Sequence, residues 1–347
     1  MWINHIDSMK NWKKNIQNTQ YKKLSEIVVL SKERNKKGED VMGKYVLKRF
    51  GSMLITLFLI ATVTFFLMHS IPGDPFELGR DTPAVVRENL EQKYGLDKPL
   101  FEQYIIYMKN LLQGDFGTSM KYKGQTVIGK VATGMPVSAL IGFGGVIIGS
   151  IIGMVLGCVA ALHNKGAVDY LVIVLAILGV SIPSFVFGSL IQKLFGVDLG
   201  WFPIQGWRSW QYAVLPMLTS AFTNIAFYAR MLRTSMLDVT KQDYIYTAKS
   251  KGLNKKEIVR KHMLRNSLLP LVTSFGPMCA GVLTGNFVVE KIFNIPGIGQ
   301  AMINAIQGSD YTMIMGLTLI FSFISAIMYF VVDVLYGVVD PRIRVAS

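Results

Sequence analysis

The chain has 347 residues, of which 51% are hydrophobic and 17% are charged, and its formal net charge is +14. A soluble domain carries about 25% charged residues, so this composition indicates a membrane protein. Two cysteines are too few for a disulfide-dense secreted scaffold.

Six stretches are predicted to be membrane-spanning helices, because each supplies the roughly 20 apolar residues that a bilayer requires. These stretches are 47–71, 136–162, 168–195, 212–232, 267–290 and 312–336. Pro183 and Pro216 predict kinks in the third and fourth helices. A further charge-free stretch, 292–309, is rich in polar residues and glycine, and is predicted to be an external loop with a short interfacial helix. Glu290 and Asp333, at span ends, are predicted to be interfacial or ion-paired.

The positive charge is concentrated in two segments. Residues 1–49 hold 12 basic and 5 acidic residues, residues 230–266 hold 10 and 3, and residues 72–135 hold 8 of each. With six spans, both termini and the loop after the fourth span lie on one side, which the positive-inside rule places in the cytoplasm. The charge therefore predicts orientation and attraction to anionic lipid rather than nucleic-acid binding.

The chain is predicted to consist of a tail and one transmembrane domain. Residues 1–41 are rich in Lys and Asn and are predicted to be a flexible cytoplasmic tail, or an extension upstream of a start at Met42. Residues 42–347 form the transmembrane domain, with an extracellular segment at 72–135 and a cytoplasmic loop at 233–266.

The extracellular segment is predicted to be folded. Thr82-Pro83 is a typical helix start, and a second helix is predicted to open at Pro99 and to stop at Gly114. The segment either docks an external partner or simply packs on the spans.

The second span carries small residues at strict four-residue spacing. They are Gly145, Gly149, Gly153, Gly157 and Ala161. This spacing places them on one helix face, where they allow another helix to approach closely. The strip predicts helix packing and gives no information about a substrate.

No catalytic or metal-binding set is apparent in the sequence. Residues 124–130 are similar to a phosphate loop, but Val131 replaces the hydroxyl residue that would hold Mg²⁺, and the segment is predicted to be external. The four histidines are scattered, and Cys158 and Cys279 fall in spans, where they are interpreted as packing residues. The chain is therefore predicted not to be an enzyme.

The loop after the fourth span is predicted to form two short helices around a break. Gly252-Leu253 interrupts the first helix, and Asn254 is placed to cap the second, with Glu257 in the capping-box position. Such a hairpin can act as a rigid lever that moves the spans. The alternative is a solvated basic loop.

This loop resembles the cytoplasmic signature of ABC-importer permeases. The matching positions are Tyr246-Thr247-Ala248, Gly252 and His262-x-Leu264-Arg265. Tyr and Thr stand for the usual Glu and Ala, His for Ile and Arg for Pro, which is similar to the peptide and nickel branch of the family.

The resemblance extends over residues 42–345. It includes Pro72-Gly-Asp-Pro75, Tyr94-Gly-Leu-Asp-Lys-Pro99, Gly114-Asp-Phe-Gly-Thr-Ser119, Pro296-Gly-Ile-Gly299, Asp310-Tyr311 and Asp340-Pro-Arg-Ile-Arg344. Together these motifs resemble the first permease subunit, the B type, of an oligopeptide or dipeptide importer.

The resemblance implies an all-α integral membrane protein with six transmembrane helices and the type I ABC-importer permease fold. It implies a bacterial cell-membrane location and four kinds of protein partner or ligand: a homologous second permease, two cytoplasmic ATPases, an external substrate-binding lipoprotein and a peptide. ATP and Mg²⁺ would be bound by the ATPases and no cofactor by this chain. Oligopeptides are the first expectation, and dipeptides, nickel or a metal–metallophore complex are the alternatives.

The resemblance also implies which residues meet the ATPase. The expected contact residues are Asp243, Tyr244, Tyr246, Thr247, Ala248, Lys251, Gly252, His262 and Arg265. Polar residues within apolar spans are candidates to line the translocation path, although such residues also join helices. These candidates are Ser181, Gln192, Asn224 and Asn286.

The residues disfavour two other function classes. An ion-coupled secondary transporter would need charged or broken-helix ion sites within an inverted repeat, whereas these spans are charge-free except near their ends and show no repeat. An intramembrane enzyme would need a nucleophile with a base, or a metal set. ATP-dependent uptake would separate the importer from both.

Overall fold

The computed structural model describes residues 43, 45–70, 95–122, 124–283 and 286–339. Apart from an isolated bridge between Thr118 and Thr126, the regular structure of these residues is helical. The expected helix start at Thr82 and the tail 1–41 lie outside the described residues.

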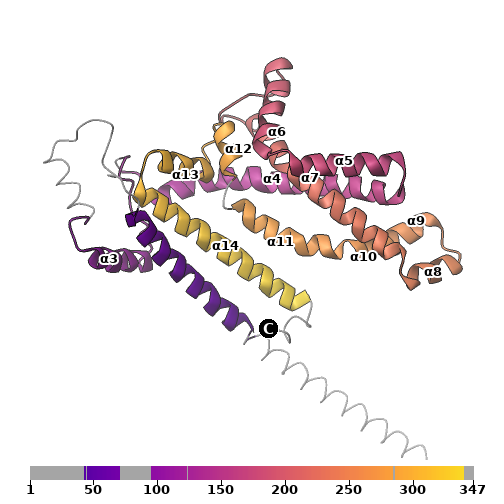
Figure 1. Cartoon of the computed structure of the whole chain (residues 1–347), viewed down its shortest axis with the longest axis horizontal. Helices are drawn as coiled ribbons and strands as arrows, with labels where there is room; N and C mark the ends of the chain where they lie inside the picture. Colours follow the sequence, from indigo (N-terminus) through magenta and orange to yellow (C-terminus); the bar gives the residue numbers. More distant parts are fainter. Residues whose placement is uncertain (1–42, 44, 71–94, 123, 284–285, 340–347) are drawn as a thin grey trace, which may run out of the picture. The chain divides into compact units, whose positions relative to one another are not determined.

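The described helices occupy all six predicted spans, and others lie in the segments 72–135, 233–266 and 292–309 (Figure 1). Their bounds are Tyr45–Ser70, α3 (Leu100–Leu112), α4 (Val127–Leu162), α5 (Ala167–Ser181), α6 (Ser184–Ile191), the π-helix η1 (Gln192–Asp198), α7 (Gln211–Thr240), α8 (Asp243–Ser250), α9 (Lys255–Glu257), the π-helix η2 (Ile258–Leu264), α10 (Arg265–Ser267), α11 (Leu269–Leu283), α12 (Phe287–Ile292), α13 (Ile298–Gln307) and α14 (Tyr311–Val339).

Three described helices are long and apolar enough to cross a membrane, and a bent pair could make a fourth span. The three are Tyr45–Ser70, α4 and the Tyr311–Val334 part of α14. The predicted fourth span belongs to α7, which continues to Thr240, and the apolar part of α11 is short, Leu269–Cys279. By length and composition alone, the structure thus supports three to four of the six predicted spans.

The third predicted span is broken. α5 and the segment Ser184–Asp198 meet at an angle of 105°. Pro183 disfavours the helical conformation of the residue before it, and Ile182 is extended, with φ −82° and ψ 119°. The sequence predicted a kink at this proline, and the structure shows a break between two helices.

The pattern of contacts divides the chain into two compact units. One unit holds residues 1–54 and 333–347, and the other holds Ile55–Val332. In the first unit Arg49 and Asp333 form an ion pair of 3.2 Å, which confirms the pairing expected for Asp333. The second unit holds the helices α3 to α13 and the features described below.

The glycine strip of α4 packs directly on α7. A Cβ added at Gly149 would lie 2.8 Å from the carbonyl oxygen of Ala221, and one added at Gly153 would lie 2.7 Å from that of Ile225. Real Cβ atoms essentially never approach so closely, so these backbones touch because the side chains are absent. The structure confirms the predicted packing role of the strip, and α4 and α7 lie side by side (Figure 1).

Two of the family-like motifs meet at the start of α14. Asp310 is buried and accepts hydrogen bonds from the Ser119 hydroxyl and from the Met120 backbone N–H, the latter at 3.1 Å. It also accepts from the backbone of Met313, so its carboxylate caps α14. The segment before α4 is thereby tied to the last helix.

Glu290 departs from its expected interfacial position. Its side chain is buried, and its carboxylate accepts backbone hydrogen bonds from Asn286 at 3.3 Å and Gln300 at 3.0 Å. A Cβ at Gly297 would collide with this carboxylate, so the glycine makes room for it. The carboxylate thus binds a free N–H group at the start of α13, which is the short helix expected in 292–309, and another at the start of α12.

Candidate functional site

The segment Asp243–Ser267 folds as a helical hairpin, called the α8–α10 hairpin below. α8 ends before Gly252, which has φ +79°, a conformation that glycine adopts without strain. The Asn254 side chain then accepts a hydrogen bond of 2.9 Å from the N–H of Glu257. The two short helices, the break and the cap are as predicted.

α8 has one buried and one exposed side. Ile245 and Ala248, three residues apart, are 1% and 4% exposed. Tyr244 and Tyr246 are 40% and 57% exposed, and Thr247 also lies on the surface. Large aromatic side chains at the surface of a helix that is already anchored are typical of a surface that meets a partner.

The buried side of the hairpin is fixed to α7 through one hydrophobic cluster. Ile245 and Ala248 belong to it, together with Ile258 from η2 and Leu232 and Met236 from α7. α8 contacts η2, and η2 contacts α7. The hairpin is therefore packed on the end of a long helix, and is not the solvated loop that the sequence left open.

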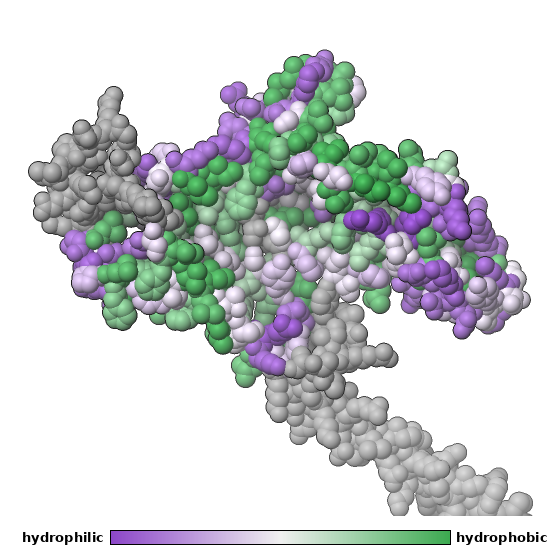
Figure 2. Space-filling model, in the orientation of Figure 1, coloured by the Kyte–Doolittle hydropathy of each residue, from purple (hydrophilic) through white to green (hydrophobic). Residues whose placement is uncertain are grey.

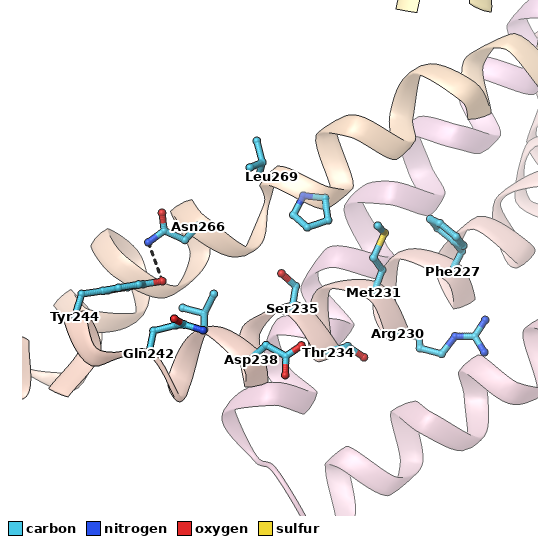
Figure 3. Close-up of a pocket in the computed structure, with 12 residues that line it drawn as sticks. Phe227, Arg230, Met231, Thr234, Ser235, Asp238, Gln242, Tyr244, Asn266 and Leu269 are labelled. Carbon is cyan, nitrogen blue, oxygen red and sulfur yellow. Dashed lines mark hydrogen bonds between the residues drawn. The ribbon is translucent and has the colours of Figure 1, made fainter. Parts of the chain in front are cut away.

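Hydrogen bonds add to this anchorage. Ser235 on α7 donates to the carbonyl of Ser267 at 3.1 Å. The amide of Asn266 donates to the Tyr244 hydroxyl at 3.2 Å (Figure 3). It also donates to the carbonyl of His262 at 2.8 Å. Asn266 thus joins the two arms of the hairpin, a role that no pattern in the sequence indicated.

A groove of about 960 Å³ lies between α7, the start of α8 and the junction of α10 with α11. Tyr244 and Asn266 lie at one end and Phe227 at the other (Figure 3). Its lining is mixed, with apolar residues such as Met231 beside polar ones such as Asp238.

Basic residues surround the exposed side of α8. Lys249 lies over the Tyr246 ring, with 5.6 Å between Nζ and the ring centroid. Lys251, Lys255 and Arg265 are also exposed. In Figure 2 the hydrophilic residues gather over the hairpin, whereas the neighbouring α5 is covered by apolar residues. This charge favours a partner surface with negative charge.

A second candidate site is an uncharged cavity of about 240 Å³ between α4, α6, α7, α11 and α12. Asn224 and Asn286 both line it, and the Asn286 amide donates to the Ser220 hydroxyl at 3.0 Å. Ser184 also lines the cavity. Ser184 and Ser220 were not among the predicted path residues, because each lies in a mainly apolar stretch and belongs to no motif.

The other two path candidates are not part of this cavity. Gln192 donates to the carbonyl of Ile204 at 2.8 Å, so its amide holds the turn after η1. Ser181 is exposed at the last residue of α5. The structure brings two of the four candidates together.

The comparisons with known proteins point to one family. The family described as "Binding-protein-dependent transport system inner membrane component" matches residues 153–345, and its N-terminal companion matches residues 42–131. The chain belongs to this family of transport permeases.

Named relatives of the permease match 87% of the chain. The dipeptide transport system permease protein DppB of Bacillus subtilis is 46% identical over 303 residues, 87% of this chain and 98% of the relative. DppB of Lactococcus lactis is 44% identical over 303 residues, 87% of this chain and the whole relative. The oligopeptide permease OppB of Haemophilus influenzae is 39% identical over 305 residues, again 87% of this chain and the whole relative.

Membership places the permease among multi-pass inner-membrane components that work with other parts of a transport system. The resemblance identified from the α8–α10 hairpin and the scattered motifs is thereby confirmed, including the B type. The motif residues Ser119 and Asp310 fall outside both candidate sites, and they hold helices together.

Proposed function

We propose that this permease forms half of the translocation path of an ATP-driven importer of peptides. Its partners are a homologous second permease, two cytoplasmic ATPases and an external substrate-binding lipoprotein, and ATP and Mg²⁺ are bound by the ATPases. The observation that carries the proposal is the two-sided α8, whose buried side is anchored to α7 while its aromatic side is free of this chain's own core. The names of the relatives support the peptide class.

The exposed side of α8 is the proposed ATPase contact. Tyr244, Tyr246 and Thr247 would enter a groove on the ATPase, and Asp243 and Lys251 would lie at its edges. Ala248 is buried and serves the anchorage instead. Gly252 shapes the turn, and His262 and Arg265 lie on the supporting arm.

Closure of the ATPase dimer would push α8 and move the permease helices. Because α8 packs on η2 and η2 packs on α7, a displacement of the hairpin passes to α7 as a rigid-body movement. α7 in turn carries Asn224, which lines the uncharged cavity. One helix therefore links the proposed ATPase contact to the proposed path.

The cavity suits a substrate of varied sequence. Asn224 and Asn286 offer neutral donors and acceptors, which pair with peptide-bond groups. No charged side chain lines the described cavity, so a charged peptide side chain would be neither strongly attracted nor repelled there. Ser181 and Gln192 remain further candidates along the path.

The proposed topology has six crossings with both termini in the cytoplasm. Residues 72–135 would then be extracellular, and the α8–α10 hairpin would lie on the cytoplasmic side with the second block of positive charge. The broken α5–α6 segment and the short α11 would each belong to a crossing that a partner permease helps to enclose.

Uptake by the complete complex in proteoliposomes tests the proposal. Labelled peptide should accumulate only with ATP, the ATPases and the binding protein, and unlabelled oligopeptides, dipeptides and Ni²⁺ should be compared as competitors. Competition by peptides supports the peptide class, and their rank order gives the preferred length. Uptake driven by an ion gradient without ATP would overturn the assignment as an ATP-driven importer. Competition by Ni²⁺ alone would overturn the assignment of peptides as the substrate class.

A Tyr246→Ala variant tests the docking face directly, with Tyr122→Ala as the matched control. The two tyrosines are 57% and 56% exposed, but Tyr122 precedes α4 and lies outside the hairpin. Loss of the large aromatic contact should weaken ATPase binding about tenfold or more, because such residues dominate interfaces. Equal binding by both variants would contradict the assignment of this face.

A further inference from the structure

A buried ion pair joins α5 to α7. The Asp169 side chain is 1% exposed and that of Arg233 is 21% exposed. The Arg233 guanidinium donates through Nε to one carboxylate oxygen and through Nη2 to the other, the second bond being 2.8 Å long. Two parallel bonds between planar groups fix their orientation as well as their distance.

Asp169 also holds the turn between α4 and α5. Its carboxylate accepts a hydrogen bond of 2.9 Å from the backbone N–H of Lys165, which has φ +63°. Asp169 lies in the first turn of α5, where a negative charge interacts favourably with the free N–H groups. One carboxylate therefore organises the α4–α5 turn, the start of α5 and the contact with α7.

The turn of α7 that carries Arg233 is also the turn that carries the hairpin. Leu232 and Met236 belong to the cluster that buries α8, and Ser235 bonds the carbonyl of Ser267. Arg233 lies within one helical turn of all three α7 residues. A displacement of the hairpin thus reaches the ion pair without passing through another element.

The far end of this connection is the uncharged cavity. α5 leads through the break at Pro183 into α6, and Ser184 at the start of α6 lines the cavity with Asn224 and Asn286. The sequence of contacts runs from α8 through η2 and α7 to Arg233, then to Asp169 and along α5.

We propose that the Asp169–Arg233 pair is a positioning contact that carries movement of the α8–α10 hairpin to α5 and so to the wall of the cavity. A buried ion pair is weak evidence for stability, because the cost of desolvation offsets much of the attraction. Its fork geometry does resist rotation and sliding of α5 against α7, which an apolar contact would allow. The proposal deepens the proposed function and rests on it.

The test compares coupling with assembly. Asp169→Asn removes the charge with little change of shape, and Arg233→Lys keeps the charge but loses the fork. The amount of peptide taken up per ATP hydrolysed should fall about two- to thirtyfold in Asp169→Asn, and less in Arg233→Lys. The ATPases should co-purify with both variants as with the wild type.

The exposed ion pair Lys193–Asp198, of 2.6 Å, supplies the matched control. Asp198→Asn removes the same charge from a surface pair and should leave the uptake-to-ATP ratio at its wild-type value, because exposed pairs contribute little. If the Asp169→Asn complex fails to assemble, the uptake-to-ATP ratio of the Arg233→Lys complex alone decides whether the ion pair has this role.

A distance measurement gives a readout independent of transport. Spin labels at the exposed positions Val174 on α5 and Lys255 on α9 should keep their separation when ATP binds to the wild-type complex. In Asp169→Asn the separation should change with ATP, because α5 no longer follows the hairpin.

Three results would overturn the inference. The first is a wild-type ratio of peptide uptake to ATP hydrolysis in both Asp169→Asn and Arg233→Lys, and the second is a loss of assembly in these variants with an unchanged ratio in the complexes that still form. The third is a separation between the two spin labels that responds to ATP in Asp169→Asn as it does in the wild type. A wild-type complex that takes up no peptide with ATP would overturn the proposed function instead, and is therefore distinguishable.

Discussion

Replacing Gly252 by valine separates the shape of the hairpin from its side-chain contacts. Gly252 has φ +79°, and a Cβ added there meets no other atom within 4 Å. The substitution therefore brings no clash with neighbouring residues, and its cost is backbone strain. A β-branched residue at positive φ costs about 1–3 kcal/mol, which corresponds to roughly a 5- to 150-fold shift in the population of the native turn.

The strain acts on two hydrogen bonds that close α8. The N–H of Gly252 donates to the carbonyl of Lys249 at 2.9 Å, and that of Leu253 donates to the carbonyl of Ala248 at 3.3 Å. When the turn opens, α8 loses its fixed angle to η2. We expect Gly252→Val to assemble in part but to take up less peptide per ATP hydrolysed.

The assay is the uptake-to-ATP ratio in proteoliposomes, with Gly252→Asn as the matched control. Asparagine tolerates the left-handed conformation, so this variant should stay close to the wild type. A wild-type ratio in Gly252→Val would refute the role of the turn. An equal loss in Gly252→Asn would show that the glycine acts by leaving surface free for the partner, and would refute the backbone argument.

Three further predictions concern the packing and the cavity. Gly153→Leu should lower the yield of monodisperse protein in size-exclusion chromatography, since overpacking costs about 1–3 kcal/mol. Gly51→Ala should leave this yield unchanged, because a Cβ added at Gly51 meets no atom within 4 Å. Asn286→Leu should raise the peptide concentration for half-maximal uptake about fivefold, the equivalent of one lost hydrogen bond, and an unchanged value would remove Asn286 from the path. Asp310→Asn should destabilise the protein by about 1–3 kcal/mol through its bonds to Ser119 and the backbone, and a thermal unfolding midpoint equal to the wild type would contradict this.

Local features were predictable because their causes lie within a few residues. The glycine strip of α4 reflects helical spacing, and the cap at Asn254 and the turn at Gly252 reflect the preferences of single residues. The long charge-free stretches likewise located helices at all six expected places. The family was predicted from the sequence motifs, because the spacing of apolar and small residues shows helices but not the family to which they belong.

Pairings between distant segments were not predictable. Asp169 and Arg233 are 64 positions apart, and each alone resembles a charge at the end of a span. Glu290 was expected at an interface because it follows an apolar run, but its carboxylate accepts from the backbone N–H groups of Asn286 and Gln300. The second of these becomes available only when the chain folds back at Gly297. Ser220 and Asn266 are similarly ordinary in sequence. A single sequence shows what a residue is able to bond, and the fold decides whether a partner is present.

The contact between α4 and α7 also affects how mutants of this permease will be discovered. Because the backbones touch at Gly149 and Gly153, every side chain larger than hydrogen separates two helices that the rest of the unit is built around. Random mutagenesis along this strip should yield strains that lack the protein, and a screen that keeps only well-expressed, transport-defective alleles will miss them. Second-site revertants should map to Ala221 and Ile225 and their neighbours on α7, where a smaller residue or a slight shift restores the space.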